Sequence, residues 1–340
     1  MHATPIQPSI QTAIQLVKKP LQQVKESIAS IVPPDSLLLS ESISYSIESG
    51  GKYLRPVLTL LCGQVLKPQT ALQETMLVET AAVAEMIHVA TLLHDDVLDQ
   101  ASLRRGKETV SSKWGSKISI LSGDFLLAQA SIKLAKLNNT RLVSIFAHVL
   151  ADLCDGEVEQ LHTSYNIETS WESYYRKSVC KTASLFAAGC ESSGVIQGMP
   201  ETKIQRLKRF GHYFGLAFQI SDDLLDYTAT EELIGKPVLE DLRNGLLTAP
   251  VLLALESENL SDSQKKLLRE NIAQLFKTPD DEDCIKQIQT LIVESQSVLK
   301  TQALAEQYIH QAECSIEFAA ESQEKQVLLH LLSYTAQRGC

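Results

Sequence analysis

Apolar residues recur along most of the chain at intervals of three and four, the spacing that gives an α-helix one buried face. Alternation at every second residue, which marks a half-buried strand, is nearly absent. We therefore expect an all-α protein that forms one large domain over residues 1–340. The helical pattern is weakest over 1–8, 161–170, 229–245 and 256–262, which we expect as a disordered N-terminal tail and as loops.

Residues that start or stop helices support this assignment. Asp35 can cap a helix that runs to about Glu48, and Pro56 can lie in the first turn of a helix that ends near Leu66. Two long helices are expected over 71–99 and 115–136. Capping boxes and similar starts are predicted at Thr70 with Gln73, Thr169 with Glu172, Ser261 with Gln264, and Thr278 before Pro279.

The first long helix ends in an acidic cluster, "HVATLLHDDVLD" (88–99). Asp95 and Asp99 are four residues apart, so their carboxylates share one face of the helix, with Asp96 between them. Like charges at this spacing destabilise a helix modestly, and a hard divalent cation such as Mg²⁺ would hold them together. A single D-D-x-x-D sequence is common by chance, and a solvated helix end is then the better interpretation.

A second such cluster makes chance a poor explanation. The stretch "GLAFQISDDLLD" (215–226) repeats the spacing with Asp222, Asp223 and Asp226, and Gln219 lies one turn earlier on the same face. If the two helices face each other across a bundle, six carboxylates surround one cavity. Carboxylates that close together need metal ions or protons.

Cations suited to a phosphate ligand lie beside glycine turns and acidic clusters. Lysine supplies a point charge and arginine a bidentate contact to a diphosphate. They are Lys52 and Arg55 in "SGGKYLRP", Arg104 and Arg105 in "LRRGK", Lys181 beside Thr182 in "KTASL", Lys236 in "GKP" and Arg243 in "DLRNG".

Composition limits the partners and the location. A net charge of −10 argues against nucleic acid, because phosphate backbones bind to basic faces. The 7 cysteines are scattered and odd in number, as in reduced intracellular thiols. We expect no secretory leader, no membrane span and a cytoplasmic location.

Together these motifs resemble the trans-(E)-isoprenyl diphosphate synthase family. The resemblance covers about 45–255 and includes, besides the motifs quoted above, "SGDFLLAQA", "DGEVEQ" and "KTASLFAAG". Within the family these sequence motifs are most similar to those of long-chain polyprenyl (solanesyl-like) diphosphate synthases. The resemblance implies a single helical bundle around a central apolar cavity, usually in a homodimer.

The resemblance also implies a role for each matching residue. The diphosphate of isopentenyl diphosphate would be held by Lys52, Arg55, His88 and Arg105. The allylic substrate, farnesyl or geranylgeranyl diphosphate, would contact Arg104, Lys181, Thr182, Gln219 and Lys236. The cofactor Mg²⁺ would be bound by Asp95, Asp96, Asp99, Asp222, Asp223 and Asp226, which with Lys181 would be the catalytic residues.

Product length is expected to depend on two small residues before the first acidic cluster. Short-chain members of the family have bulky aromatic residues near the positions of Ala90 and Thr91. Small side chains there would let the tail pass, so we expect a long all-trans product, with solanesyl diphosphate as the single best prediction. The chain departs from the family pattern at Glu108, Ser111, Val238 and Leu239.

Several alternatives remain open at this point. A short-chain farnesyl or geranylgeranyl synthase would share nearly all of these motifs. A class I terpene cyclase would share the first acidic cluster but would not need "GGKYLRP" or the arginine pair. A non-catalytic regulatory subunit tends to lose one cluster, and a structural Mg²⁺- or Ca²⁺-binding protein would not need the cations.

Loose membrane association during product release is also expected.

Overall fold

The computed structural model describes residues 8–33, 35–49, 51–228 and 239–337. The N-terminal part contains α1 (Pro8–Leu16), α2 (Lys18–Ala29), α3 (Leu37–Glu48), α4 (Leu54–Val65), α5 (Ala71–Leu98), the strands β1 (Leu103–Arg104) and β2 (Lys107–Glu108), α6 (Val110–Trp114), α7 (Ser116–Lys136) and α8 (Thr140–Thr163). The remainder contains α9 (Trp171–Ser178), the π-helix η1 (Val179–Ala183), α10 (Ser184–Ile196), α11 (Glu201–Thr228), α13 (Glu240–Arg243), α14 (Ala249–Leu255), α15 (Asp262–Leu275), α16 (Glu282–Ser295), α17 (Ser297–Ile316) and α18 (Gln323–Gln337).

The all-α prediction is confirmed, since strands within the described ranges are confined to one short hairpin. The chain forms two compact units. The first contains 1–148, 185–208 and 318–328, and the second contains 149–184, 209–317 and 329–340. A single-domain organisation, with residues 1–8 as a tail, stays a prediction.

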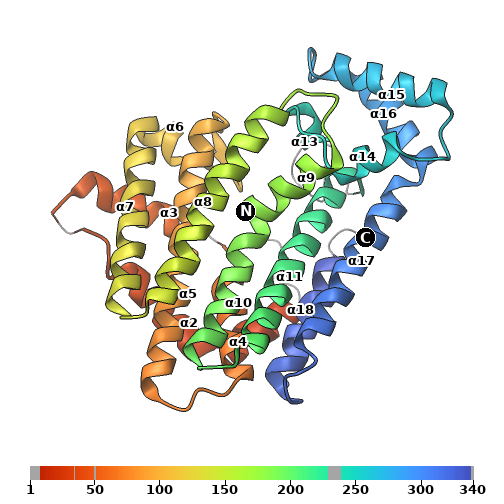
Figure 1. Cartoon of the computed structure of the whole chain (residues 1–340). Helices are drawn as coiled ribbons and strands as arrows, with labels where there is room; N and C mark the ends of the chain where they lie inside the picture. The colour runs from red at the N-terminus through yellow and green to blue at the C-terminus, as the bar shows by residue number, and fades with distance from the viewer. Residues whose placement is uncertain (1–7, 34, 50, 229–238, 338–340) are drawn as a thin grey trace. The chain divides into compact units, whose positions relative to one another are not determined.

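The first unit is built around α5, which packs against α2, α4 and α7 (Figure 1). Its Thr70–Gln73 capping box is present as predicted. Residues such as Leu77, Ala81 and Ile87 are almost fully buried, because neighbouring helices cover α5 on several sides. A helix with this much apolar contact positions any charged side chain on it firmly.

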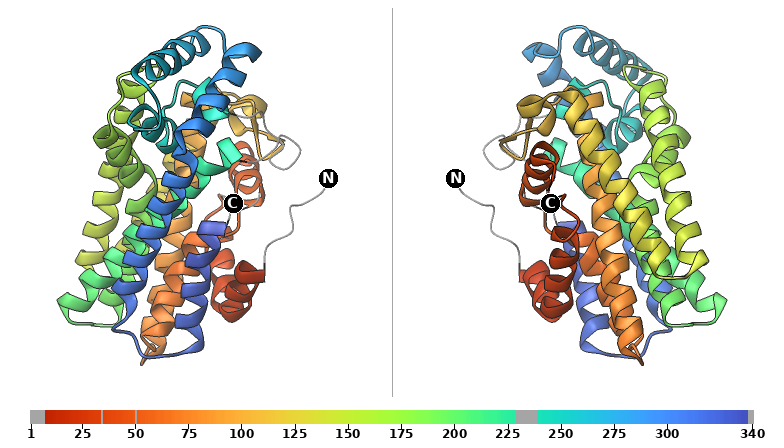
Figure 2. Two further views of the ribbon diagram at one scale, coloured as in Figure 1. Left: turned by 90° about the vertical axis from the view of Figure 1, so that its right-hand side faces the viewer. Right: turned by 90° about the vertical axis from the view of Figure 1, so that its left-hand side faces the viewer.

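The second unit has an apolar core that α14, α15 and α16 share. Helices α15 and α16 form a hairpin, visible at the top of both views in Figure 2. Leu268 and Ile272 of α15 and Ile288 of α16 are fully buried in it. The predicted capping box of Ser261 and Gln264 starts α15, so the loop expected over 256–262 is also confirmed.

Several predicted helix ends are displaced by a few residues. The residue before α3 is Ser36 and not Asp35, and the cap of α9 is Ser170 and not Thr169. Helix α16 starts after Asp281, whose carboxylate accepts the amide of Cys284, and not at Thr278. The side chains of Ser170 and Asp281 accept the cap hydrogen bonds of α9 and α16, whereas Ser36 makes no side-chain cap bond to α3.

Two described helices, α5 and α7, are long and apolar enough to cross a membrane by length and composition. In α5 67% of the apolar window is buried inside the protein, but in α7 only 33% is. The exposed apolar face of α7 is considered below.

Candidate functional site

A tight hairpin presents the arginine pair. Arg104 pairs with Lys107, and the two turn residues, Arg105 and Gly106, have φ of 53° and 75°. A two-residue turn with positive φ at both positions matches the twist of its strands, and glycine at the second position makes it easier to form. The sequence analysis did not predict this hairpin, because two-residue strands show no alternation.

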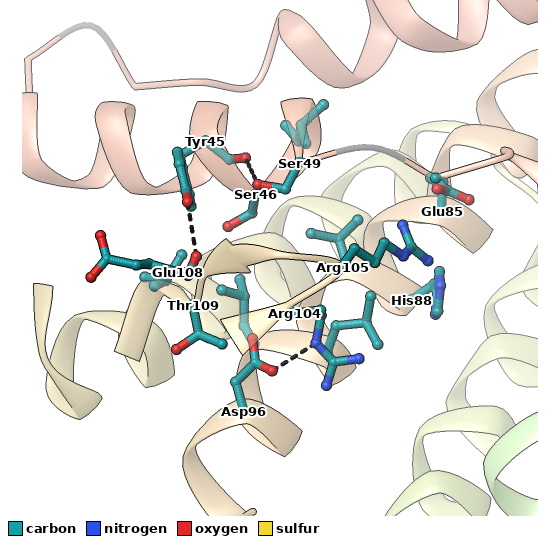
Figure 3. Close-up of a pocket in the computed structure, with 16 residues that line it drawn as sticks. Tyr45, Ser46, Ser49, Glu85, His88, Asp96, Arg104, Arg105, Glu108 and Thr109 are labelled. Carbon is teal, nitrogen blue, oxygen red and sulfur yellow. Dashed lines mark hydrogen bonds and ion pairs between the residues drawn. The ribbon is translucent and has the colours of Figure 1, made fainter. Parts of the chain in front are cut away.

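The two arginines have different surroundings (Figure 3). Arg104 donates from Nε to Oδ1 of Asp96 at 2.7 Å, whereas Arg105 points toward Glu85 and His88. Both line a cavity of about 60 Å³, together with Ser49, Gly51, Glu85 and His88, among others. The hairpin therefore brings a fixed positive charge into a pocket beside the loop that follows α3.

The imidazole of His88 lines this pocket. Burial lowers its pKa well below the ordinary value, and the charges of Arg55 and Arg105 lower it further. Arg55 also lies over the ring of Phe186, with 4.7 Å between its guanidinium carbon and the ring centroid. Lys52 lies on the exposed loop before α4 and is not part of the cavity wall.

The first acidic cluster occupies the last turn of α5. Asp99 follows the helix, and its amide donates to the carbonyl of Asp95 at 2.8 Å, so helical geometry continues between them. Asp95 is partly buried and Asp99 is exposed. Asp96 differs, because it is only 4% exposed and its carboxylate binds Arg104. Burial raises the pKa of Asp96, and Arg104 partly opposes this rise.

In the second unit a π-helical turn carries Lys181 and Thr182 (η1). Single π-turns inside α-helices are frequent at functional sites. Lys181 forms an ion pair with Glu157 and donates to Oε1 of Gln160 at 3.0 Å, both on α8. Helix α8 comes close here only because residue 156 is glycine: a Cβ there would lie 2.7 Å from Cγ of Lys181.

A chain of hydrogen bonds runs from η1 to the second acidic cluster. Thr182 donates to Oε1 of Gln219 at 2.7 Å, and Gln219 donates to Oδ1 of Asp223 at 2.9 Å. The hydroxyl of Tyr174 donates to the other oxygen of Asp223 at 2.6 Å. Asp223 is 1% exposed, and burial raises its pKa despite these bonds. Its carboxylate therefore fixes the positions of its neighbours.

Asp226 caps the short helix α13. Its two carboxylate oxygens accept the amides of Glu240 at 2.8 Å and Asp241 at 3.1 Å. Burial, and then the charge of Asp241, raise the pKa of Asp226 to about 7. Asp222, one turn earlier on the same face, is partly buried.

The donors at both clusters suit a hard cation. They are carboxylate oxygens, which Mg²⁺ and Ca²⁺ prefer, and Mg²⁺ needs only one or two of them besides water and phosphate. No group of three or more His, Cys, Asp or Glu side chains within the described ranges is already arranged as a metal site. The carboxylates of the two clusters are the residues that would hold such a cation.

Comparison with known proteins identifies the family. The polyprenyl synthetase family model matches residues 36–292. The chain belongs to the polyprenyl synthetase family. This confirms the predicted family and the prenyltransferase class of enzyme.

Two relatives and one solved structure illustrate the similarity. Solanesyl-diphosphate synthase 2, chloroplastic, of Oryza sativa subsp. japonica is 32% identical over 332 residues, which are 97% of this chain and 80% of that protein. Heptaprenyl diphosphate synthase component 2 of Geobacillus stearothermophilus is 39% identical over 240 residues, covering 71% and 74% of the two chains. A crystal structure of a polyprenyl synthase from Caulobacter crescentus CB15, complexed with calcium and isoprenyl diphosphate, has a TM-score of 0.87 at 30% identity and covers 97% of this chain and 98% of that one.

Most of the site residues that the family resemblance implies lie within the described residues. Lys236 and Val238 lie outside the described residues. The departures Glu108 and Ser111 have defined contacts: the Glu108 carbonyl accepts the hydroxyl of Tyr45 at 2.8 Å, and Ser111 donates to the carbonyl of Asp96 at 3.4 Å. Leu239 is buried and precedes α13 with φ of 58°.

Four contact residues were not predicted from the sequence. Glu157 and Gln160 are three residues apart in "DGEVEQ" and so share one face of a helix, but this spacing does not indicate that Lys181 is their partner. Nothing in the sequence around Tyr174 indicates its contact with Asp223. Glu85 can be noticed in the sequence, because it is a charged residue in the middle of an apolar run. His94, beside Asp95, has its Nε2 3.2 Å from the carbonyl oxygen of Ile120.

Proposed function

We propose that this protein is a long-chain trans-polyprenyl diphosphate synthase. It adds successive isopentenyl diphosphate units to an allylic diphosphate, with farnesyl or geranylgeranyl diphosphate as the first acceptor. The product supplies isoprenoid or quinone side-chain synthesis. The observation that carries the proposal is the pocket of the first unit, whose wall contains Arg105 and His88 together with Asp96 of the acidic cluster.

We assign the two diphosphates to different residues. Arg105, Arg55 and neutral His88 bind the diphosphate of isopentenyl diphosphate, with Lys52 from the exposed loop. Lys181 and Thr182 bind the allylic diphosphate, assisted by Arg104, Gln219 and Lys236. Donors that are held in place before the reaction stabilise charge on a leaving diphosphate most effectively. Glu157 and Gln160 hold Lys181 in this way.

We propose that all six aspartates hold Mg²⁺: Asp95, Asp96, Asp99, Asp222, Asp223 and Asp226. Asp96, Asp223 and Asp226 also accept hydrogen bonds from protein donors, which hold their carboxylates in place. Bound Mg²⁺ would supply Lewis-acid stabilisation of the departing diphosphate. The apolar side chains of Val89, Leu92 and Leu93 in the pocket wall exclude water, which would otherwise react with an allylic cation.

Substrate dependence tests this function directly. Purified protein is incubated with radiolabelled isopentenyl diphosphate, with or without farnesyl diphosphate, Mg²⁺ and EDTA. After enzymatic dephosphorylation of the product, we expect label in extractable polyprenol only when both diphosphates and Mg²⁺ were present in the reaction. A terpene cyclase would instead convert the allylic diphosphate alone, and a regulatory subunit would turn over neither substrate.

We further propose that two copies of this chain associate through the apolar face of α7. Ile120, Leu121 and Ile132 on this helix are 42%, 54% and 45% exposed. Light scattering should give a dimer, and Leu121→Glu should give a monomer. The matched control is Val293→Glu at a 74% exposed position of α16, which should leave the dimer intact. A monomeric wild type would favour a different partner subunit, a possibility that the word "component" in the name of the Geobacillus relative raises.

A further inference from the structure

One carboxylate lies on the wall of the pocket that we assign to isopentenyl diphosphate. Glu85 is 6% exposed and lies three residues before His88, so both side chains project from the same face of α5. In Figure 3 the guanidinium of Arg105 lies between the Glu85 carboxylate and the His88 ring. A buried negative charge is unexpected beside a diphosphate and requires an explanation.

The Glu85 carboxylate and the Arg105 guanidinium both lie close to Gly51, in the loop before α4. A Cβ on Gly51 would lie 3.5 Å from Nη1 of Arg105 and 3.6 Å from Oε1 of Glu85. The cation and the carboxylate thus approach the same point, and the missing side chain leaves the room for both. Burial raises the pKa of Glu85 to about 7, while the charges of Arg55 and Arg105 oppose the rise.

Binding of a diphosphate would change the charges around Glu85. It carries several negative charges and would bind the arginines that now compensate Glu85. Like charges in a confined site favour protonation of one of them. Glu85 cannot retreat into solvent, because it is buried in the middle of α5. Uptake of a proton by Glu85 removes its charge without moving α5.

The other titratable groups around Glu85 come from every neighbouring element. Tyr53 and Arg55 come from the loop before α4 and its first turn, and Arg104 and Arg105 from the hairpin. Lys25 of α2 lies farther out, over the ring of Tyr53. His88 on α5 could gain a proton near neutral pH, and Asp96, whose pKa burial also raises, lines the same pocket; substitution of Glu85 itself therefore has to show which group is the acceptor.

We propose that Glu85 neutralises the empty diphosphate pocket and takes up one proton from solvent when isopentenyl diphosphate binds. The inference rests on the proposed function. An O–H bond forms on the carboxylate, and no bond of the ligand changes. Above pH 7 the binding of isopentenyl diphosphate should weaken with rising pH, approaching tenfold per pH unit, the limit for uptake of one proton.

Calorimetry can count this proton. Isopentenyl diphosphate alone, which cannot condense without an allylic partner, is titrated at pH 8 in two buffers of different ionisation enthalpy. The wild type should take up close to one proton, and Glu85→Gln close to none. Glu79→Gln is the matched control, because Glu79 is on the same helix but pairs with Lys133 at 2.8 Å outside the pocket; it should behave as the wild type.

The His88→Gln variant identifies the acceptor. It should retain the proton uptake if Glu85 is the acceptor, and loss of the uptake would overturn the inference. Binding without proton uptake by the wild type would also overturn it, even if Glu85→Gln does not fold. Failure of the wild type to bind isopentenyl diphosphate and to condense it would instead refute the proposed function.

Discussion

At the scale of single residues, three of the six aspartates have protein partners that the structure defines. Asp96, Asp223 and Asp226 are bound by a guanidinium, a tyrosine hydroxyl with a glutamine amide, and two backbone amides. Asp95 and Asp99 share one face at the end of α5. The repeated D-D-x-x-D sequence predicts six carboxylates, but it does not predict that Arg104, Tyr174 and the backbone amides of α13 bind three of them.

The difference in burial between Asp95, which is partly buried, and Asp223, which is 1% exposed, predicts different effects of their substitution. Asp95→Ala should lower kcat by about 10²–10³-fold through lost metal-assisted charge stabilisation, while the melting temperature stays near that of the wild type. Asp223→Ala should cost about 1–3 kcal/mol of stability, because it leaves the buried hydroxyl of Tyr174 unpaired. Steady-state kinetics and thermal unfolding test this, and a strongly destabilised Asp95→Ala protein would contradict the assignment.

The two assigned diphosphate sites predict a split in kinetic constants. Arg105→Ala should mainly raise the KM for isopentenyl diphosphate, and Lys181→Ala the KM for the allylic substrate. A lost hydrogen bond to a charged group costs about 1.5–3 kcal/mol, or roughly 10–150-fold. Each KM is measured with the other substrate saturating. Equal effects of both changes on both constants would show that the sites are not separate.

The buried carboxylate of Glu85 predicts a pH dependence of stability. Its pKa is raised to about 7 in the folded protein, so it ionises less readily there than in the unfolded chain. Its stabilising contribution is present below about pH 4.5 and is lost as the pH rises to about 7, a change of roughly 3 kcal/mol. The stability of Glu85→Gln relative to wild type should therefore increase between pH 5 and 8 in denaturant titrations. A constant difference would contradict the assignment.

At the scale of elements, local signals predicted some features and tertiary contacts decided others. Helix α5 was predicted within a residue, because Thr70 and Gln73 form its capping box. The hairpin that aims Arg105 depends on positive φ at two residues, and two-residue strands leave no periodic trace. The contact of Lys181 with α8 depends on Gly156, whose significance appears only when the two helices meet. Sequence predicts which residues carry chemistry better than it predicts their partners.

Helix α5 also carries the prediction about product length. Ala90 is fully buried against Ile43 and Leu126, so Ala90→Phe would overpack this cluster, at about 1–3 kcal/mol. Thr91 is only partly buried, and its hydroxyl bonds the carbonyl of His88 at 2.8 Å. Thr91→Tyr is therefore the cleaner test and should shift products toward farnesyl or geranylgeranyl diphosphate. Unchanged product length in a folded Thr91→Tyr protein would place the determinant elsewhere.

At the scale of the whole molecule, each compact unit carries one aspartate cluster with its own cations. Arg104 and Arg105 accompany the cluster on α5 in the first unit, and Lys181 accompanies the cluster on α11 in the second. The expectation that the two clusters face one cavity stays a prediction, as does loose membrane association. A cytoplasmic location also stays a prediction, and the rice relative is named as chloroplastic.

Mass spectrometry of the reaction product tests the central proposal most directly. The purified protein is incubated with farnesyl diphosphate, excess isopentenyl diphosphate and Mg²⁺, and the dephosphorylated products are resolved by mass. We expect all-trans polyprenols longer than geranylgeraniol, with solanesol as the main species. Products that end at geranylgeraniol would contradict the long-chain assignment, and unconsumed farnesyl diphosphate would contradict the synthase itself.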